Sequence, residues 1–125
     1  MKKILVIDDN EIMRETLSDI LQLENFHVIQ AVNGKEGLSF IKKEHIDMLV
    51  TDIVMPEMDG IAVIIETRML KPTLPILAIS GENSALESVF EFLRLLGVNS
   101  ISLKPFDIDD FVREVRCILE SKKIF

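Results

Sequence analysis

Short apolar runs and helix-like stretches alternate along the chain, and each pair predicts one strand and one helix. Residues 4–7, 48–51 and 75–79 are the most continuous apolar runs. Such runs are typical of strands that are covered on both faces of a parallel sheet. The runs at 28–29 and 100–103 are weaker because polar residues interrupt or adjoin them. We therefore expect these two strands at the edges of the sheet and the other three at its centre.

Apolar residues recur at helical spacing between these runs, and a polar residue that can cap a helix precedes each stretch. The predicted caps, in chain order, are Asp9 or Asn10, Asn33, Asp59, Ser84 with Glu87 as a capping box, and Asp107. Gly97 is expected to end the fourth helix, because glycine accepts the left-handed conformation common after a helix C-terminus. The pattern predicts five helices in all.

Five successive strand–helix units predict an α/β fold with one parallel sheet and helices on both faces. With the second and fifth strands at the edges, the favoured strand order is 2-1-3-4-5, a doubly wound, flavodoxin-like sheet. No linker or internal repeat is visible, so we expect residues 1–125 to form a single domain. In this topology, ligands bind at the carboxyl ends of the strands, beside strands one and three.

The acidic composition narrows the classes of function. The 125 residues include 14 Lys and Arg against 21 Asp and Glu, which gives a formal net charge of -7. Phosphate contacts need clustered cations, so no direct binding of nucleic acid is expected. Cys117 is the only cysteine, which excludes an internal disulfide and a zinc-ligand motif. No apolar stretch approaches the roughly 18 residues of a membrane-spanning helix. We expect a cytoplasmic protein that does not enter the membrane.

Polar side chains with distinct chemistry follow four of the predicted strands. Asp8 and Asp9 follow the first strand, and Asp52 follows the third. Because the carboxyl ends of parallel strands meet at one edge, these carboxylates should cluster, and their mutual repulsion then calls for a cation. Hard oxygen ligands open to water suit Mg²⁺, for which Mn²⁺ could substitute. Ser80 and Lys104 bring a hydroxyl and an ammonium from strands four and five.

This combination of groups fits phosphoryl transfer to a carboxylate. Asp52 would attack phosphorus in line, while the metal and Lys104 would neutralise the phosphoryl oxygens. Backbone amides near residues 53–54 and at Gly81 could hold the remaining oxygens. A single strand-end aspartate is often only a helix cap, and Asp9 alone could be one, but three converging acids are hard to explain that way.

Over its whole length the chain resembles the receiver domain of the two-component response-regulator family. Four motifs in chain order carry the resemblance: Asp8-Asp9-Asn10, Asp52 to Pro56 with Asp59-Gly60, Ser80-Gly81, and Lys104-Pro105-Phe106. The resemblance implies that Asp52 is the phosphoacceptor, that Ser80 turns toward the phosphoryl group and that Lys104 pairs with it. The implied Mg²⁺ ligands are Asp8, Asp9, Asp52 and the backbone carbonyl of Val54.

The resemblance also implies partners and an output. The phosphoryl donor would be a sensor histidine kinase, a histidine phosphotransfer protein or a small acyl phosphate, and the group would be lost by slow self-hydrolysis. A downstream protein or effector domain would read a surface on the fourth helix and fifth strand. The domain would act as a monomer or as a phosphorylation-dependent dimer. Whether it stands alone or is the N-terminal part of a transcriptional or enzymatic regulator stays open.

Two positions bear on how such a signal would leave the site. Ile101 stands where most receivers carry Tyr or Phe, so the usual aromatic rotamer change is not available in its usual form. The fourth helix carries Phe92 and Leu95 away from its apolar face. These two side chains are either covered by neighbouring loops or form a surface for a partner.

Three other functions are alternatives to this reading of the site. A phosphatase of the haloacid-dehalogenase type normally has a second acid two residues after its nucleophile, where this chain has Val54. A flavodoxin-like cofactor site would need Ser, Thr and Gly after the first strand, where Asp8 and Asp9 would repel a phosphate. A receiver-shaped module that is never phosphorylated is the third alternative.

Overall fold

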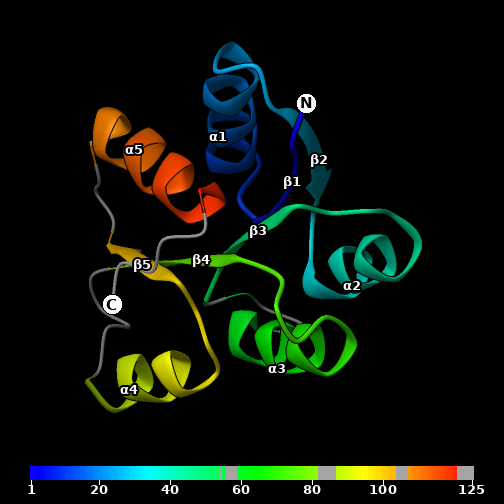
Figure 1. Ribbon diagram of the computed structural model, residues 1–125, viewed down its shortest axis with the longest axis vertical. Coiled ribbons are helices and arrows are strands. Elements are labelled where there is room, and N and C mark those ends of the chain that lie inside the picture. The colour runs from blue at the N-terminus through cyan, green and yellow to red at the C-terminus, as the bar shows by residue number, and fades with distance from the viewer. Residues whose placement is uncertain (54, 56–58, 82–86, 104–106, 121–125) are drawn as a thin grey trace.

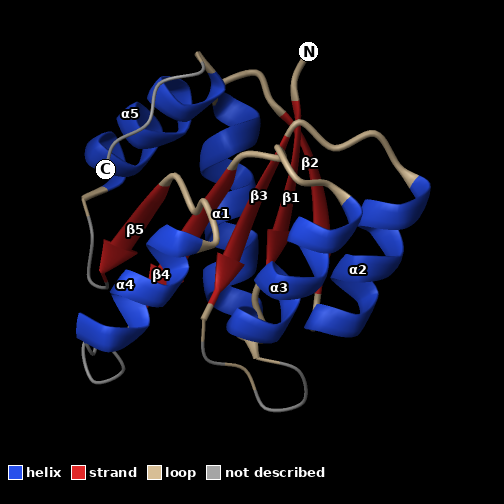
Figure 2. Cartoon of the chain, turned by 60° about the horizontal axis from the view of Figure 1, so that its bottom comes forward, coloured by secondary structure: helices blue, strands red, loops and turns tan. Residues whose placement is uncertain are grey.

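Five parallel strands form one sheet, with helices on both faces (Figures 1 and 2). The computed structural model describes residues 1–53, 55, 59–81, 87–103 and 107–120, and it leaves out the side chains of residues 87 and 88. The strands are β1 (Lys3–Ile7), β2 (His27–Ala31), β3 (Met48–Asp52), β4 (Ile76–Ser80) and β5 (Ser100–Leu103). Their order is β2-β1-β3-β4-β5, as the sequence predicted.

The helices are α1 (Glu11–Leu23), α2 (Gly34–Lys43), α3 (Gly60–Leu70), α4 (Glu87–Leu95) and α5 (Ile108–Leu119). In Figure 1, α1 and α5 lie on one face of the sheet, and α2, α3 and α4 lie on the other. None of the helices among the described residues is both long and apolar enough to cross a membrane.

The burial of the strands explains the sheet order. Every residue of β3 and β4 is buried, and four of the five residues of β1 are buried, whereas β2 and β5 keep exposed or half-buried positions. The prediction that the second and fifth strands are edges is therefore confirmed. β2 is longer than the predicted apolar pair, because its backbone continues to pair with β1 as far as Ala31.

Alternate residues of the central strands enter two separate cores. Leu5 and Ile7 face the α2, α3 and α4 layer, whereas Ile4 and Val6 face α1 and α5. This follows from the period of two in a strand, which sends successive side chains to opposite faces. Phe111 of α5 is among the largest fully buried side chains. Full burial of a side chain of this size contributes roughly 1.5–3 kcal/mol.

Helix ends agree with the predicted caps wherever the structure describes them. The side chains of Asn10, Asn33, Asp59 and Asp107 accept backbone N–H groups at the starts of α1, α2, α3 and α5. Of the two candidates at α1, Asn10 is the cap. Gly97 has φ 78° just beyond α4, as expected of a residue that ends a helix. Ser84 and the side chain of Glu87 lie outside the described residues, so the predicted capping box stays a prediction.

The exposed apolar side chains on α4 are not covered by the loops that the structure describes. Leu93 is fully buried, but Leu95 is 79% exposed and Phe92 is 43% exposed. The described loops therefore leave Leu95 largely open to solvent, which counts against partial cover of this side chain by those loops. The alternative, a surface for a partner, stays a prediction.

Candidate functional site

The strand register brings the functional side chains to one edge of the sheet. Ile7 of β1 pairs with Thr51 of β3, so Asp8 and Asp52 each follow a paired residue. Asp52 pairs with Ile79 of β4, and Ser80 comes directly after it. The carboxyl ends of β1, β3 and β4 therefore meet at this edge, as a parallel sheet requires.

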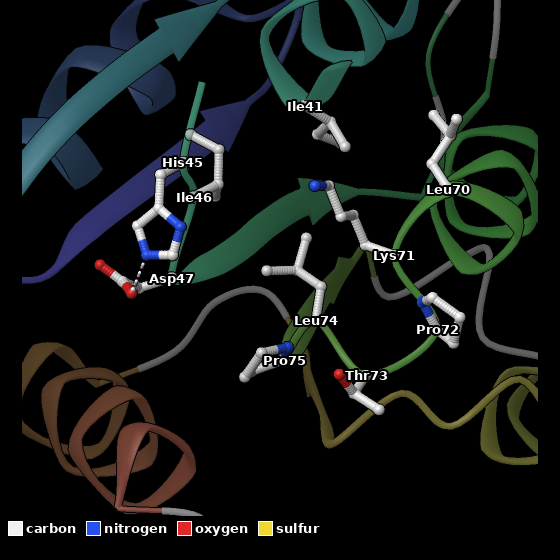
Figure 3. A pocket seen from close by; sticks show the side chains of 10 residues that line it. All are labelled: Ile41, His45, Ile46, Asp47, Leu70, Lys71, Pro72, Thr73, Leu74 and Pro75. Atoms are coloured by element: carbon white, nitrogen blue, oxygen red, sulfur yellow. Dashed lines mark hydrogen bonds and ion pairs between the residues drawn. The ribbon is translucent and has the colours of Figure 1, made fainter. Parts of the chain in front are cut away.

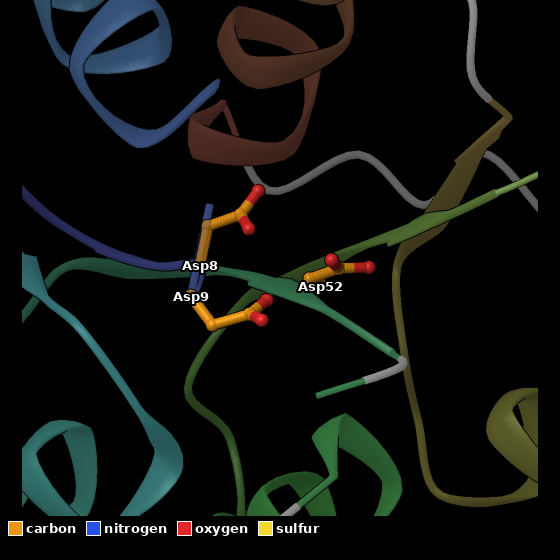
Figure 4. Close-up of side chains that lie close together, drawn as sticks. All are labelled: Asp8, Asp9 and Asp52. Atoms are coloured by element: carbon orange, nitrogen blue, oxygen red, sulfur yellow. The ribbon is translucent and has the colours of Figure 1, made fainter. Parts of the chain in front are cut away.

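Asp8, Asp9 and Asp52 form an acidic cluster at this edge (Figure 4). One carboxylate oxygen from each lies within 4.8 Å of the others. Asp8 and Asp52 are buried, with 1% and 7% of their surface exposed, whereas Asp9 is exposed. The predicted convergence of the three carboxylates is confirmed. Two of them are buried, and the third, that of Asp9, is open to solvent.

Hydrogen bonds to other described residues hold the main chain around Asp8. Its N–H donates to the carbonyl of Ala31 at 3.3 Å, and its Oδ1 accepts the N–H of Asn10 at 2.9 Å. Its carbonyl accepts Nη1 of Arg14 at 3.1 Å. These contacts join β1 to β2 and α1, so the position of the Asp8 carboxylate is set by the fold.

Asp52 ends the fully buried strand β3, and its surroundings are equally fixed. The N–H of Ile53 donates to the carbonyl of Ile79 at 2.9 Å, which continues the pairing of β3 with β4 past Asp52. Thr51 Oγ1 donates to the Asp52 carbonyl at 3.0 Å. A side chain at Gly60 would overlap that same carbonyl, so the start of α3 packs directly against the backbone of Asp52.

The electrostatics of the cluster favour a cation. Two unit charges about 5 Å apart repel by roughly 3 kcal/mol at an effective dielectric constant of about 20. The three carboxylates offer only hard oxygen ligands, and Asp9 leaves one side of the cluster open to water. Mg²⁺ prefers one or two carboxylates and several waters, so the residues present fit this ion.

Ser80, Lys104 and Val54 differ in how far the structure describes them. Ser80 is fully buried, and its hydroxyl donates to the carbonyl of Gly81 at 3.2 Å, which is long for such a bond. Lys104 and Val54 lie outside the described residues. Leu103, which precedes Lys104, pairs with Ser80 in the register of β4 and β5, so the end of β5 reaches the same edge.

Arg14 is a residue near the site that the sequence reasoning missed. It is only 8% exposed, and it lies on the buried face of α1 with Leu17, Ser18 and Leu21. Arg14 precedes Leu17 and Ser18 by three and four residues, which places it on the same face of the helix, and this spacing was the signal that could have revealed its burial. Charged residues of a helix are usually assumed to face water, so the signal was not used.

A hollow of about 360 Å³ lies at the amino ends of the strands, among the residues that precede β3 and β4 (Figure 3). His45 Nε2 lies 3.0 Å from Asp47 Oδ1, and the other carboxylate oxygen of Asp47 accepts the N–H of Lys3 at 2.8 Å. This hollow is separate from the acidic cluster and has no part in its chemistry.

The chain belongs to the response regulator receiver domain family, whose model matches residues 4–116. It is similar to the response regulator MprA of Mycobacterium ulcerans (strain Agy99), with 32% identity over 98% of this chain and 52% of that protein. It is also similar to the alkaline phosphatase synthesis transcriptional regulatory protein PhoP of Bacillus subtilis (strain 168), with 32% identity over 98% and 50%. The chain spans about half the length of these curated relatives.

Solved structures agree with this assignment. The fold matches a CheY-like receiver domain protein from Methanospirillum hungatei JF-1 with a TM-score of 0.92 and 25% identity, covering 97% of this chain and 95% of that one. A receiver domain protein from Clostridium thermocellum matches with a TM-score of 0.88 and 25% identity, over 99% and 98%. The chain is thus a signalling phosphoacceptor module, and its acidic triad is typical of the receiver Mg²⁺ site. A domain of this class implies a partner histidine kinase.

Proposed function

We propose that Asp52 accepts a phosphoryl group from a sensor histidine kinase or a histidine phosphotransfer protein. An Asp52 carboxylate oxygen forms a bond to phosphorus while the nitrogen–phosphorus bond of phosphohistidine breaks, and the released imidazole takes a proton from solvent. With an acyl phosphate as donor, the bond that breaks joins phosphorus to oxygen. The observation that supports this role is the cluster of three carboxylates at the ends of two neighbouring strands.

Asp8, Asp9 and Asp52, with the backbone carbonyl of Val54, would hold Mg²⁺. When bound, the ion supplies positive charge to the phosphoryl oxygens. Asp8 and Asp52 provide buried ligands with little freedom to move, and the exposed Asp9 provides a ligand on the side from which a donor approaches. Lys104 would pair with a phosphoryl oxygen from the end of β5.

Ser80 is the proposed switch. Its hydroxyl now makes a bond of 3.2 Å to the Gly81 carbonyl, and a phosphoryl oxygen on Asp52 would be a stronger acceptor. Donating to that oxygen instead favours the conformation in which the end of β4 closes on the site. The phosphoryl group is then lost by slow self-hydrolysis. The domain therefore acts as a signalling switch and not as an enzyme that turns over a substrate.

The output surface is proposed to lie on α4 and β5. Leu95, Phe92 and Leu103 are exposed there, at 79%, 43% and 47%. Ile101 is half-buried and packs against the core on the α4 side, so it has less room to change position than an exposed aromatic ring. A downstream protein, an effector domain of the same polypeptide or a second phosphorylated copy would bind this surface. Leu95→Glu should weaken that binding and leave phosphorylation intact.

The test is intact mass after treatment with acetyl phosphate and Mg²⁺. We expect a gain of one phosphoryl group in the wild type and none in Asp52→Asn. Asp19→Asn, which changes an exposed acid on α1, is the matched control and should behave as the wild type. If neither acetyl phosphate nor a phosphorylated histidine protein modifies the wild type, the domain is a binding module of receiver shape.

A further inference from the structure

Arg14 is a buried cation beside the acidic cluster, and the proposed chemistry gives it no role. It lies in α1, and only 8% of its surface is exposed. Burying a guanidinium is costly unless hydrogen-bond acceptors meet it. Two do so: Nη1 donates to the Asp8 carbonyl at 3.1 Å, and Nε donates to Gln30 Oε1 at 3.1 Å. The guanidinium thus joins the cluster to α1 and to the edge strand β2.

These contacts close a ring of hydrogen bonds around the turn that carries Asp8 and Asp9. The N–H of Arg14 donates to the Asn10 carbonyl at 2.9 Å, and the N–H of Asn10 donates to Asp8 Oδ1 at 2.9 Å. The Arg14 side chain then returns to the Asp8 carbonyl. Asp9 lies between two residues that this ring holds, so its backbone is held as well.

We propose that Arg14 is a positioning residue for the metal site: it holds the Asp8–Asn10 turn so that two carboxylates converge on Asp52 before the metal binds. Without such a restraint, repulsion between the carboxylates would turn the Asp9 carboxylate away from the other two. Arg14 acts through the main chain and touches neither the metal nor the phosphoryl group. The inference rests on the proposed Mg²⁺ binding.

Charge and geometry predict opposite effects at this position. The positive charge of Arg14 opposes a nearby cation, so an effect of charge alone would make Mg²⁺ bind more tightly when the charge is removed. Loss of positioning would make it bind more weakly. Arg14→Lys separates the two effects, because lysine keeps the charge but lacks the planar fork that reaches two acceptors at once.

The experiment is calorimetric titration of the unphosphorylated protein with Mg²⁺. We expect the dissociation constant of Arg14→Lys to rise about tenfold, the lower end of the effect of groups that orient metal ligands. Arg113→Lys is the matched control, because Arg113 is an exposed arginine of α5 paired with Asp110, and it should bind as the wild type. At saturating Mg²⁺, phosphorylation of Arg14→Lys by acetyl phosphate should recover.

A second readout needs no metal. In the Mg²⁺-free protein, the Asn10 amide should exchange its hydrogen faster in Arg14→Lys, because that amide donates to Asp8 Oδ1 within the ring. Wild-type Mg²⁺ affinity in Arg14→Lys, whatever its thermal stability, would overturn the proposal. Tighter binding in Arg14→Gln with no change in Arg14→Lys would overturn it too, in favour of charge alone.

If the wild type binds no Mg²⁺, the proposed function fails. Hydrogen exchange of the Asn10 amide then tests the positioning role of Arg14 by itself, and an unchanged exchange rate in Arg14→Lys overturns that role. If Arg14→Lys does not fold, Gln30→Met on the exposed edge strand replaces it, since this change removes the acceptor of Arg14 Nε. Its Mg²⁺ dissociation constant should rise two- to threefold, and an unchanged value overturns the proposal.

Discussion

The N–H of Gly60 donates to the carbonyl of Ile53 at 2.6 Å, which ties the first residue of α3 to the residue after Asp52. A side chain at Gly60 would overlap the Asp52 carbonyl and the Ile53 Cα. Only glycine allows this close approach of helix and strand end. The start of α3 and the proposed phosphoacceptor are therefore one packed unit.

Gly60→Ala should damage both stability and phosphorylation. The added methyl group meets backbone atoms, which cannot rotate away as a flexible side chain can, so we expect a loss of about 1–3 kcal/mol in the free energy of unfolding. The displaced Asp52 should also accept phosphate from acetyl phosphate more slowly. Urea denaturation and the rate of mass gain measure the two effects.

Gly97→Ala is the control for this prediction. Gly97 has φ 78°, so alanine there costs about 1–2 kcal/mol from the backbone conformation alone, but the residue lies beyond α4 and away from Asp52. Its phosphorylation rate should match that of the wild type. A wild-type rate in Gly60→Ala as well would contradict the link between α3 and the site.

Asp9→Asn should stabilise the Mg²⁺-free protein and reduce its response to Mg²⁺. Removing one of three clustered charges relieves repulsion, and because Asp9 is exposed the gain is screened to at most about 1 kcal/mol. Thermal denaturation with and without Mg²⁺ tests this, since a ligand that binds only the folded state raises its stability. Asp19→Asn should change neither value. A full Mg²⁺ response in Asp9→Asn would remove this residue from the metal site.

Much of the fold and of the site could be predicted because their signals are local. Uninterrupted apolar runs marked the central strands, and the caps Asn33, Asp59 and Asp107 stood directly before their helices. Asp8 and Asp52 were found because parallel topology places strand ends together whatever the details of packing.

The features that could not be predicted depend on contacts that the sequence pattern does not mark. Asp9 and Asn10 were equal candidates for the cap of α1 until the geometry assigned Asn10. No pattern could show that Arg14 reaches back to the Asp8 carbonyl, or that Gly60 abuts the backbone of Asp52. Both contacts are made with backbone carbonyls, those of Asp8 and Asp52, and because every residue has such a carbonyl, these contacts leave no trace in the sequence.

Arg68 is another side chain of this kind, and its replacement should be costly. Four of its hydrogen bonds reach backbone carbonyls at the end of α3, before β4 and after α4, namely those of Lys71, Leu74, Leu96 and Gly97. Burial lowers the pKa of its guanidinium from the usual value. The four carbonyls compensate for that burial, and they hold the turn between α4 and β5 against α3.

We expect Arg68→Met to lower the free energy of unfolding by about 2–4 kcal/mol, because it removes the donor to three part-buried carbonyls, those of Leu74, Leu96 and Gly97. Arg68→Lys should lie between this variant and the wild type, since an ammonium reaches fewer of the carbonyls. Arg113→Met removes only an exposed ion pair and should leave the free energy of unfolding close to that of the wild type. Urea denaturation of the three variants measures the series, and equal losses in Arg68→Met and Arg113→Met would contradict it.

Asp47 gives the fold a defined dependence on pH. Burial raises the pKa of its carboxyl, but hydrogen bonds from the Lys3 N–H and from His45 outweigh this and leave the pKa below its usual value. A carboxyl whose pKa is lower in the folded state stabilises the fold at pH values above its unfolded pKa, which is about 4. That stabilisation is lost as the pH falls through the lower, folded-state pKa.

Asp47→Asn should therefore be less stable than the wild type near neutral pH, by about 1 kcal/mol or less after solvent screening. The amide has one acceptor oxygen, whereas the carboxylate uses two, one for the Lys3 N–H and one for His45. The difference should shrink as the pH falls below about 4, where the unfolded carboxyl takes up a proton, and on through the lower pKa of the folded one. Thermal denaturation of both proteins across this range tests the prediction, with Asp19→Asn as an exposed acid for comparison. A difference that stays constant down to the lowest pH would mean that the second acceptor oxygen of Asp47, and not its charge, stabilises this end of the sheet.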